Sequence, residues 1–562
     1  MITILNNISI VLSICFISTF ILFGWGNLTS RAIGLTNPNK LFSTQLLIGL
    51  VSVSIFIEAC HFFVPIDWRL TTVVAIFGIL SLNYSSLLNY VNLFKSFLKK
   101  KPFVSFFSLL ILFYWSLRVI QVPTNADTAG YHLQTIRWLN QYPIIPGIAN
   151  LSFHYGFNQS YFEFLALLKT FPYFNKGFEL GGMIFFLITS LTLLERSSKK
   201  YIGFAFFAFL LYLIAHSAGS TLFSPTPDLI IAFVEVIIFS ILIDYTFNIK
   251  DKNSQKESVI LLLALSTYLF TIKLSSLFFS IGVFLIVIQK ITLKDKLFLR
   301  AILFCLSFIV IHFISGYILS GSPLFPNTIG SLQNLPWAVP SEQAKIFTQI
   351  IYSWPRNPYL PSEQVLQNFD WVSFWIKRMP VRNLIYLLTA ILLLLVNLYL
   401  VIKYKNKIAD KFKIGILFLP VLGSIIFWFL TAPDFRFLGA SLEIFIALCI
   451  LYSSHLTSFL RDKIRKIFEV NNFIRYMLII LMTQILLSLH HGVNTEWKDI
   501  PVVATYKIIN KSGLTINIPI NSLCWDSDLP CINGDLVNGD VRATSSLHLI
   551  KDGDLSSGFS VK

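Results

Sequence analysis

The feature that most constrains this chain is a series of apolar runs, each about 20 residues long, that recurs along nearly the whole sequence. A helix of about 20 apolar residues crosses the hydrocarbon core of a bilayer and satisfies its backbone hydrogen bonds internally. The charged fraction is 13% and the mean hydropathy is +0.70, whereas soluble domains carry roughly 25% charged residues. The runs therefore predict an all-α polytopic membrane protein.

We expect about 14 transmembrane helices, with an error of about two. They lie near residues 8–24, 41–63, 70–91, 103–121, 177–194, 201–219, 229–247, 257–272, 275–289, 298–319, 382–402, 413–431, 437–455 and 474–490. The N-terminal stretch lacks the basic region and the small-residue cleavage site of a signal peptide, so we expect the first span to be retained.

The net charge of +16 comes largely from lysines and arginines in short connections between the spans. These basic connections are residues 95–101, 195–200, 250–256, 290–296, 403–413 and 461–466. The positive-inside rule makes them cytoplasmic and places the N-terminus, the long connections 122–176 and 321–381 and the C-terminal tail on the outer side. The basic charge thus indicates orientation and attraction to anionic lipid rather than nucleic-acid binding.

The pattern of spans and connections divides the chain into five parts. We expect N-terminal accessory transmembrane helices in 1–101, a membrane core in 102–320 with the outer loop 122–176, an outer aromatic and proline-rich loop in 321–381, C-terminal transmembrane helices in 382–490, and an outer tail in 491–562.

Each outer part has its own expected structure. Mixed polar and apolar spacing in the first loop predicts an amphipathic helix that lies on the membrane, followed by a second short helix from about 158 to 168 that returns the chain to the bilayer. In the second loop we expect one helix near 341–353, and its tryptophans form either an aromatic belt or a lid or sugar-stacking surface. Alternation and turn signals in the tail predict short β-strands.

The six cysteines fall into two groups. Cys524 and Cys531 flank a short turn-rich segment of the outer tail, in a compartment that permits disulfides. We expect them to form a disulfide that stabilises the tail by roughly 2 kcal/mol, with two free thiols as the alternative. The others lie in apolar spans and are expected to be core residues: Cys15, Cys60, Cys305 and Cys449.

Ionisable residues gather at the outer ends of the spans, where a functional role is the first hypothesis because an ionised group in hydrocarbon costs about 2.5 to 3.5 kcal/mol. The candidates are Asp127, Tyr131, His132 and His154 in the first outer loop, Asp228 in "SPTPD", Lys273 in "TIKLSS", and Asp434 and Arg436 in "APDFRF". If the helices close into one bundle, these connections surround a single outer cavity. Such a cavity suits an anionic substrate with a reacting hydroxyl or amine.

Each candidate also has a purely structural interpretation. Asp127 and Asp228 could cap or start helices, and Lys273 could extend its ammonium group to the membrane interface. Asp434 and Arg436 could form a surface pair, and His154 could be an ordinary loop residue. The intramembrane acids are expected to hydrogen-bond to neighbouring helices, with a proton relay as the alternative: Glu58, Glu235 and Glu443.

Signatures of soluble enzymes are absent from the sequence. There is no P-loop, no G-x-G-x-x-G, no H-E-x-x-H and no G-x-S-x-G. A reaction driven by a nucleoside triphosphate within this chain is therefore not expected. Energy must come from an activated substrate or from a gradient.

The segment "NADTAGYH" resembles the GT-C superfamily of integral-membrane glycosyltransferases. In that superfamily an acidic residue follows a membrane helix at the start of the first large outer loop and precedes an amphipathic helix, and Asp127 occupies the matching position. The chain also resembles a branch of bacterial multi-pass proteins over roughly residues 100–455. The shared pieces are "D-x-x-G-Y-H", "S-P-x-P-D", "T-I-K-L-S", "G-x-P-L-F-P" and "P-D-x-R-F", here at 127–132, 224–228, 271–275, 321–326 and 433–437.

The resemblance implies an inverting transferase that uses a polyprenyl-phosphate-linked sugar. Asp127 would take the proton of the acceptor hydroxyl, while Lys273 and Arg436 would stabilise the departing phosphate. Tyr131 and His132 would orient the acceptor, and the remaining candidates would bind substrate: His154, Asp228 and Asp434. Many members carry two adjacent acids where this chain has Asp127 and then Thr128, so we assign no metal ligands and leave a divalent cation open.

We therefore expect a GT-C-like glycosyltransferase of the bacterial cytoplasmic (inner) membrane, with its active site on the outer side. Its acceptor would be an envelope glycan, lipid or protein. One alternative is a flippase or transporter for lipid-linked glycans, which would need charges along a pathway and inverted repeats. The other is a glycan polymerase or ligase of a different membrane fold.

Overall fold

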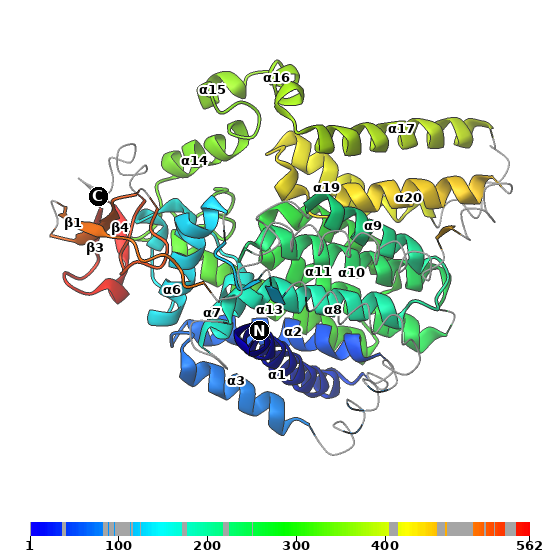
Figure 1. Ribbon diagram of the computed structural model, residues 1–562, viewed down its shortest axis with the longest axis horizontal. Helices are drawn as coiled ribbons and strands as arrows, with labels where there is room; N and C mark the ends of the chain where they lie inside the picture. The colour runs from blue at the N-terminus through cyan, green and yellow to red at the C-terminus, as the bar shows by residue number, and fades with distance from the viewer. Residues whose placement is uncertain are drawn as a thin grey trace.

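The long apolar runs form long helices, shown in Figure 1. A computed structural model describes residues 2–35, 41–82, 119–123, 125–170, 177–216, 224–249, 251–403, 414–457, 498–510, 513–521, 523–533 and 547–561, with single residues between these ranges. In this part of the chain, seven helical segments are long and apolar enough to cross a membrane. They are α1 (Ile2–Ile33), α2 (Phe42–His61), η5 with α8 (Phe178–Leu180, Gly181–Glu195), α10 (Pro227–Phe247), α11 (Lys252–Ile272), α13 (Lys296–Ser320) and α17 (Val381–Lys403).

Shorter apolar helices also lie on expected spans. They are α3 (Trp68–Leu80), α9 (Ile202–His216), η7 with α12 and η8 (Leu274–Ser276, Leu277–Val287, Ile288–Lys290), α19 (Phe418–Leu430) and α20 (Ser441–Leu456). The expected spans near 103–121 and 474–490 fall largely outside the described residues. The chain is thus a helical membrane protein with seven candidate spans, and the full set of about 14 is not shown.

The burial of the long helices gives their places in the bundle. Of the 18 most apolar consecutive residues of α10, 89% are buried inside the protein, whereas the same measure for α17 is only 17%. α10 packs against α8, α9 and α11, and α17 packs along α20. Figure 1 shows α17 and α20 on one side of the bundle and α1 and α3 on the opposite side. α10 is therefore central, and α17 turns most of its surface outward.

Glycines let the first two helices approach closely. A Cβ at Gly49 would lie 1.8 Å from the carbonyl oxygen of Leu22, and one at Gly26 would lie 2.0 Å from that of Gln45. Small residues at helix contacts favour packing in lipid, where the hydrophobic effect does not drive helices together. α2 also contacts α7, α8, α11 and α13, so the N-terminal helices are packed into the bundle.

Short helices form in the two long connections that the sequence predicts on the outer side, which we call the first and second outer loops. The first holds η2 (Thr128–His132), α6 (Leu133–Gln141), η3 (Ile148–Asn150), η4 (Phe153–Gly156) and α7 (Ser160–Thr170). The second holds α14 (Ser341–Ser353), α15 (Ser362–Val365) and α16 (Trp371–Arg378), and α14 is the helix expected near 341–353. The turn η9 (Phe435–Leu438) joins α19 to α20.

The C-terminal tail forms two small antiparallel pairs of strands. β1 (Thr505–Ile509) pairs with β2 (Thr515–Pro519), and β3 (Leu547–Leu549) pairs with β4 (Phe559–Val561). The short helix η10 (Leu555–Ser557) comes just before β4. A disulfide joins Cys524 to Cys531. The tail packs on the first outer loop through a cluster of buried residues that includes Trp138, Ile145, Tyr155, Ile516, Ile518 and Phe559. The cluster reaches Tyr131, four residues after Asp127.

Serine substitution of both disulfide cysteines, Cys524→Ser with Cys531→Ser, should loosen the tail. Closing a loop of this size contributes about 2 kcal/mol in the chain-entropy model. We expect faster proteolytic cleavage within residues 498–533 while the helical bundle stays intact, measured by limited proteolysis with mass spectrometry. Cys305→Ser, which removes a partly buried thiol of α13, is the matched control. Equal cleavage rates for the double variant and the wild type would contradict a stabilising role.

Candidate functional site

Asp127 lies at the start of the first outer loop with its carboxylate turned away from its own helix. The capping role belongs to Asn125, whose Oδ1 accepts a hydrogen bond from the backbone N–H of Asp127 at 3.0 Å. Asp127 itself is in the right-handed helical conformation and makes no capping hydrogen bond. The interpretation of Asp127 as a helix N-cap is therefore wrong. Its Oδ2 instead accepts a hydrogen bond from Nη1 of Arg436 at 3.0 Å.

Arg436 links two carboxylates. Its Nε and Nη2 both donate to Oδ2 of Asp434 at 3.3 Å, and its backbone N–H donates to Oδ1 of Asp434 at 2.9 Å. The side chain of Arg436 is 30% exposed, and its guanidinium lies 5.5 Å from the ring centre of Trp354. Asp434 and Arg436 thus do form a pair, but a partly buried one that also holds Asp127.

Tryptophans of the second loop and of α19 hold this turn in place. The indole N–H of Trp375 donates to the carbonyl of Pro433 at 2.9 Å, and that of Trp428 donates to the carbonyl of Asp434 at 2.7 Å. Trp375 is 6% exposed and packs against Trp428 and Trp371. Trp371 and Trp375 are therefore not open for sugar stacking, whereas Trp354, at 47% exposed, is.

A second ion pair joins Asp228 and Lys273. Proline at the first position of α10 and the capping hydroxyl of Thr226 fix the helix start, which places Asp228 in the first turn. Nζ of Lys273 donates to Oδ1 of Asp228, and it lies 4.1 Å from the ring centre of Phe437. The side chain of Lys273 is 19% exposed, and that of Asp228 is 8% exposed. Lys273 therefore does not extend to the interface but is neutralised within the cluster.

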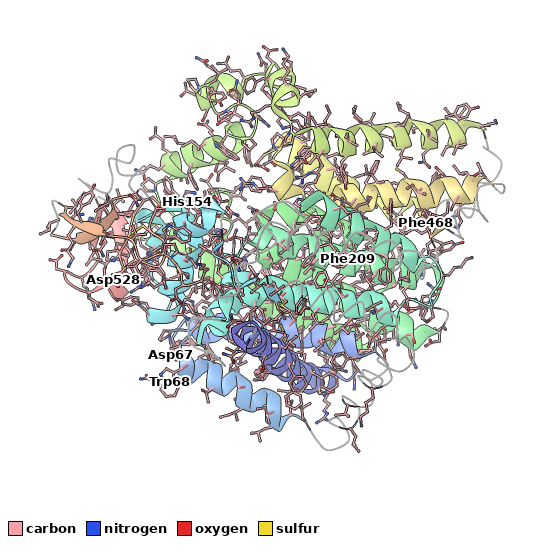
Figure 2. All side chains as sticks on the ribbon, viewed as in Figure 1. Asp67, Trp68, His154, Phe209, Phe468 and Asp528 are labelled. Carbon is pink, nitrogen blue, oxygen red and sulfur yellow. A yellow bond between two sulfur atoms is a disulfide. The ribbon has the colours of Figure 1, made fainter. Side chains whose placement is uncertain are left out.

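Aromatic rings line the same region. The ring of Tyr131 stacks on that of His154 at 4.7 Å and meets that of His132 edge-on at 4.5 Å. The hydroxyls of Thr128 and Ser224 share a hydrogen bond that ties the first loop to the segment before α10. Figure 2 shows His154 near the end of the molecule that the tail covers, and Phe209 within the helical bundle.

Burial decides the protonation of these rings. Burial lowers the pKa of His132 to about 3 and that of His154 to about 4, so both imidazoles are neutral at pH 7. Burial also raises the pKa of Tyr131, and the carboxylates of Asp127 and Asp228 raise it further. The phenol therefore stays protonated and can donate a hydrogen bond.

The cluster carries more negative than positive charge. Its three carboxylates, Asp127, Asp228 and Asp434, face two cations, Lys273 and Arg436. Burial alone lowers the pKa of Arg436, but the surrounding carboxylates outweigh burial and raise it above its ordinary value. Among the residues described, no group of three or more His, Cys, Asp or Glu side chains has an arrangement that could hold a metal ion.

Sequence reasoning missed the contact between the tail and the segment after Asp127. The backbone N–H of Trp525 donates to the carbonyl of Ala129 at 2.7 Å. Nε2 of Gln134 donates to the carbonyls of Trp525 and Ser527 at 3.1 and 2.8 Å. Trp525 has a φ of 49°, a left-handed conformation that bulky residues rarely adopt, and these hydrogen bonds hold it there.

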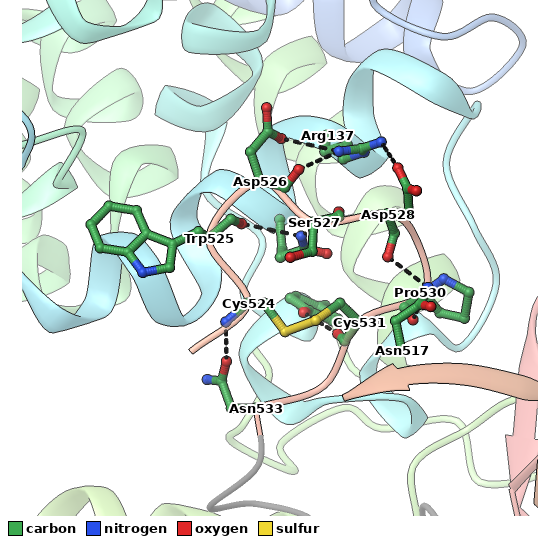
Figure 3. Close-up of a disulfide and its surroundings, with 12 residues drawn as sticks. Arg137, Asn517, Cys524, Trp525, Asp526, Ser527, Asp528, Pro530, Cys531 and Asn533 are labelled. Atoms are coloured by element: carbon green, nitrogen blue, oxygen red, sulfur yellow. Dashed lines mark hydrogen bonds and ion pairs between the residues drawn. A yellow bond between two sulfur atoms is a disulfide. The ribbon is translucent and has the colours of Figure 1, made fainter. Parts of the chain in front are cut away.

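Charges fix the same contact, as Figure 3 shows. Arg137 of α6 donates to the backbone carbonyl of Asp526 and pairs with the carboxylate of Asp528. Lys169 of α7 pairs with Asp526 at 3.0 Å. In the sequence, the signal is the polar face of an amphipathic helix, which is also typical of a helix that lies on a membrane.

Lys273→Met should destabilise the protein because it leaves the buried carboxylate of Asp228 without its cation. Removing one partner of a buried pair costs about 3 kcal/mol or more. We expect a clearly lower melting temperature in detergent, measured by fluorescence-detected unfolding, and partial recovery when Asp228→Asn is added. Lys294→Met, at an exposed connection, is the control. A wild-type melting temperature for Lys273→Met would show that the pair contributes nothing.

Comparisons with known proteins give one match. A family model described as a domain of unknown function, DUF8201, matches residues 8–442. No curated protein and no solved structure matches the chain. The matched region is more than half of the sequence and includes every residue of the polar cluster described above. The chain therefore belongs to the DUF8201 family.

Proposed function

We propose that this protein is a membrane glycosyltransferase that moves a sugar from a polyprenyl-phosphate donor to an envelope glycan, lipid or protein. The observation that carries the proposal is the carboxylate of Asp127, held by Arg436 in a polar cluster at one end of a helical membrane bundle. The reaction would take place on the outer face of the bacterial cytoplasmic membrane. The resemblance to GT-C enzymes at "NADTAGYH" points to the same chemistry.

Asp127 is suited to act as the general base. Oδ2 is engaged by Arg436, whereas Oδ1 makes no hydrogen bond with the residues that the structure describes, and the side chain is 38% exposed. Oδ1 would accept the proton of the acceptor hydroxyl as its oxygen bonds to the anomeric carbon. The bond from that carbon to the phosphate oxygen breaks, and the lipid phosphate leaves with the electron pair. A base in hydrogen-bond reach contributes perhaps 10²- to 10⁴-fold.

The other candidates have supporting roles in this proposal. Tyr131 and the neutral His154 can exchange hydrogen bonds with sugar hydroxyls without adding charge. His132 is 1% exposed and packs against Tyr131, so it would act by positioning that ring. Arg436 positions Asp127, and Lys273 offsets Asp228. Because both cations are already paired, they stabilise a departing phosphate less than free cations would.

One observation favours a second candidate function, transport of a lipid-linked glycan. Nδ1 of His312 in α13 lies 2.9 Å from Oε1 of Glu58 in α2, and both side chains are buried. Ionisable pairs within membrane helices often belong to proton or substrate pathways. A glycan polymerase or ligase would use the same outer cluster as the proposed transferase.

Asp127→Asn should abolish sugar transfer, with a loss of at least about 10²-fold, because the amide cannot accept the proton. The measurement is mass spectrometry of lipid-linked sugars and envelope glycans from cells that carry the variant at normal expression. Asp370→Asn, at an exposed site in the second loop, is the control and should keep wild-type product.

The side on which the donor accumulates separates the two functions. A dead transferase leaves the lipid-linked sugar on the outer leaflet, where an externally added impermeant glycosidase can reach it, and a dead flippase leaves it inside. Unchanged product in Asp127→Asn cells would remove the catalytic role of this carboxylate.

A further inference from the structure

A cavity of about 180 Å³ lies next to Arg436, on the side of the η9 turn that faces α9, α17 and α20. Its walls come from the end of α9, the first turn of α17, the η9 turn and the start of α20. The polar residues that line it include His216, Arg382, Asn383, Asp434, Arg436 and Glu443. Arg436 is therefore shared between this cavity and the carboxylate of Asp127.

Arg382 differs from the other cations of this region. Lys273 and Arg436 each form an ion pair with a carboxylate. Arg382 is exposed and makes no hydrogen bond or ion pair with any residue of the described ranges, and the carboxylate of Glu443, which lines the same cavity, attracts it from a longer distance. Arg382 also belongs to the first turn of the 23-residue helix α17, where the helix dipole adds positive potential. An unpaired guanidinium at the edge of a cavity is suited to bind a phosphate group.

The other polar residues of the cavity suit a sugar rather than a bare anion. Glu443, which is 5% exposed, offers acceptor oxygens, and Asn383 offers both a donor and an acceptor. Phe435 and Tyr386 supply aromatic surface in the same wall. A phosphate placed against Arg382 would therefore have hydrogen-bonding groups for attached hydroxyls beside it.

The position of the cavity favours a ligand that arrives from the membrane. α17 is the least buried of the long helices and exposes a continuous apolar surface below Arg382. Ile385, Leu388 and Leu392 are 56%, 55% and 62% exposed. An isoprenoid chain lying along this surface would bring its phosphate to the first turn of α17.

We propose that this cavity binds the sugar-phosphate head group of a polyprenyl lipid, with Arg382 as the principal ligand of the phosphate. The inference rests on the proposed function, which it deepens by naming where the donor phosphate lies. In this proposal Arg382 is the cation that is free to bind the phosphate, because Lys273 and Arg436 are already paired with carboxylates.

The test is equilibrium binding of radiolabelled farnesyl phosphate to the purified full chain in detergent, with inorganic phosphate in a parallel arm. Arg382→Ala should weaken farnesyl phosphate binding about tenfold or more, because a charged hydrogen bond is lost. Arg382→Lys, which keeps the charge, should recover part of the affinity. Lys377→Ala, which removes an exposed cation of α16, is the matched control and should bind like the wild type.

The two binding arms distinguish a lipid ligand from a soluble phosphate ligand. An effect of Arg382→Ala on farnesyl phosphate alone supports a lipid ligand, and an equal effect in both arms supports a phosphate site that also takes soluble ligands. Wild-type affinity in Arg382→Ala overturns the proposal. Arg382-dependent binding by the otherwise wild-type chain, together with unchanged product in Asp127→Asn cells, would overturn the proposed function and leave this site standing.

Discussion

The ion pair between Asp127 and Arg436 is the contact on which the arrangement of the polar cluster depends. It joins two connections that lie 309 residues apart in the chain. A charged group at the edge of a membrane bundle is costly unless it is paired, so each residue fixes the position of the other. The pair of Asp228 and Lys273 applies the same constraint to two further helix ends. Together these pairs bring four connections to one place.

The tail and the second outer loop hold this arrangement from two sides. Tail residues bind α6 through backbone carbonyls and through the charges around Arg137, and the disulfide closes the binding loop. Tryptophans of the second loop and of α19 donate to carbonyls of the turn that carries Arg436. Hydrogen bonds from distant parts of the chain thus set the direction of the Asp127 and Arg436 side chains, leaving one oxygen of Asp127 open.

Local patterns predicted the elements, but not how they meet. The apolar runs gave the positions of the described membrane helices, and the proline and helix signals gave α14. The partner of Asp127 could not be read from the sequence, because several arginines and lysines were equally available to it. Likewise, the mixed polar and apolar spacing of α6 predicts a helix that lies on the membrane surface, whereas its polar residues Gln134 and Arg137 bind the tail. Such contacts depend on tertiary packing, which single-chain periodicity does not encode.

The most direct test of this account is an experimental structure of the full chain in lipid nanodiscs. We predict a distance of roughly 3 to 4 Å between the carboxylate of Asp127 and the guanidinium of Arg436, with the other carboxylate oxygen open to a cavity at the same end of the bundle. A structure in which Asp127 bonds to its own helix, or in which Arg436 lies in another part of the protein, would contradict it.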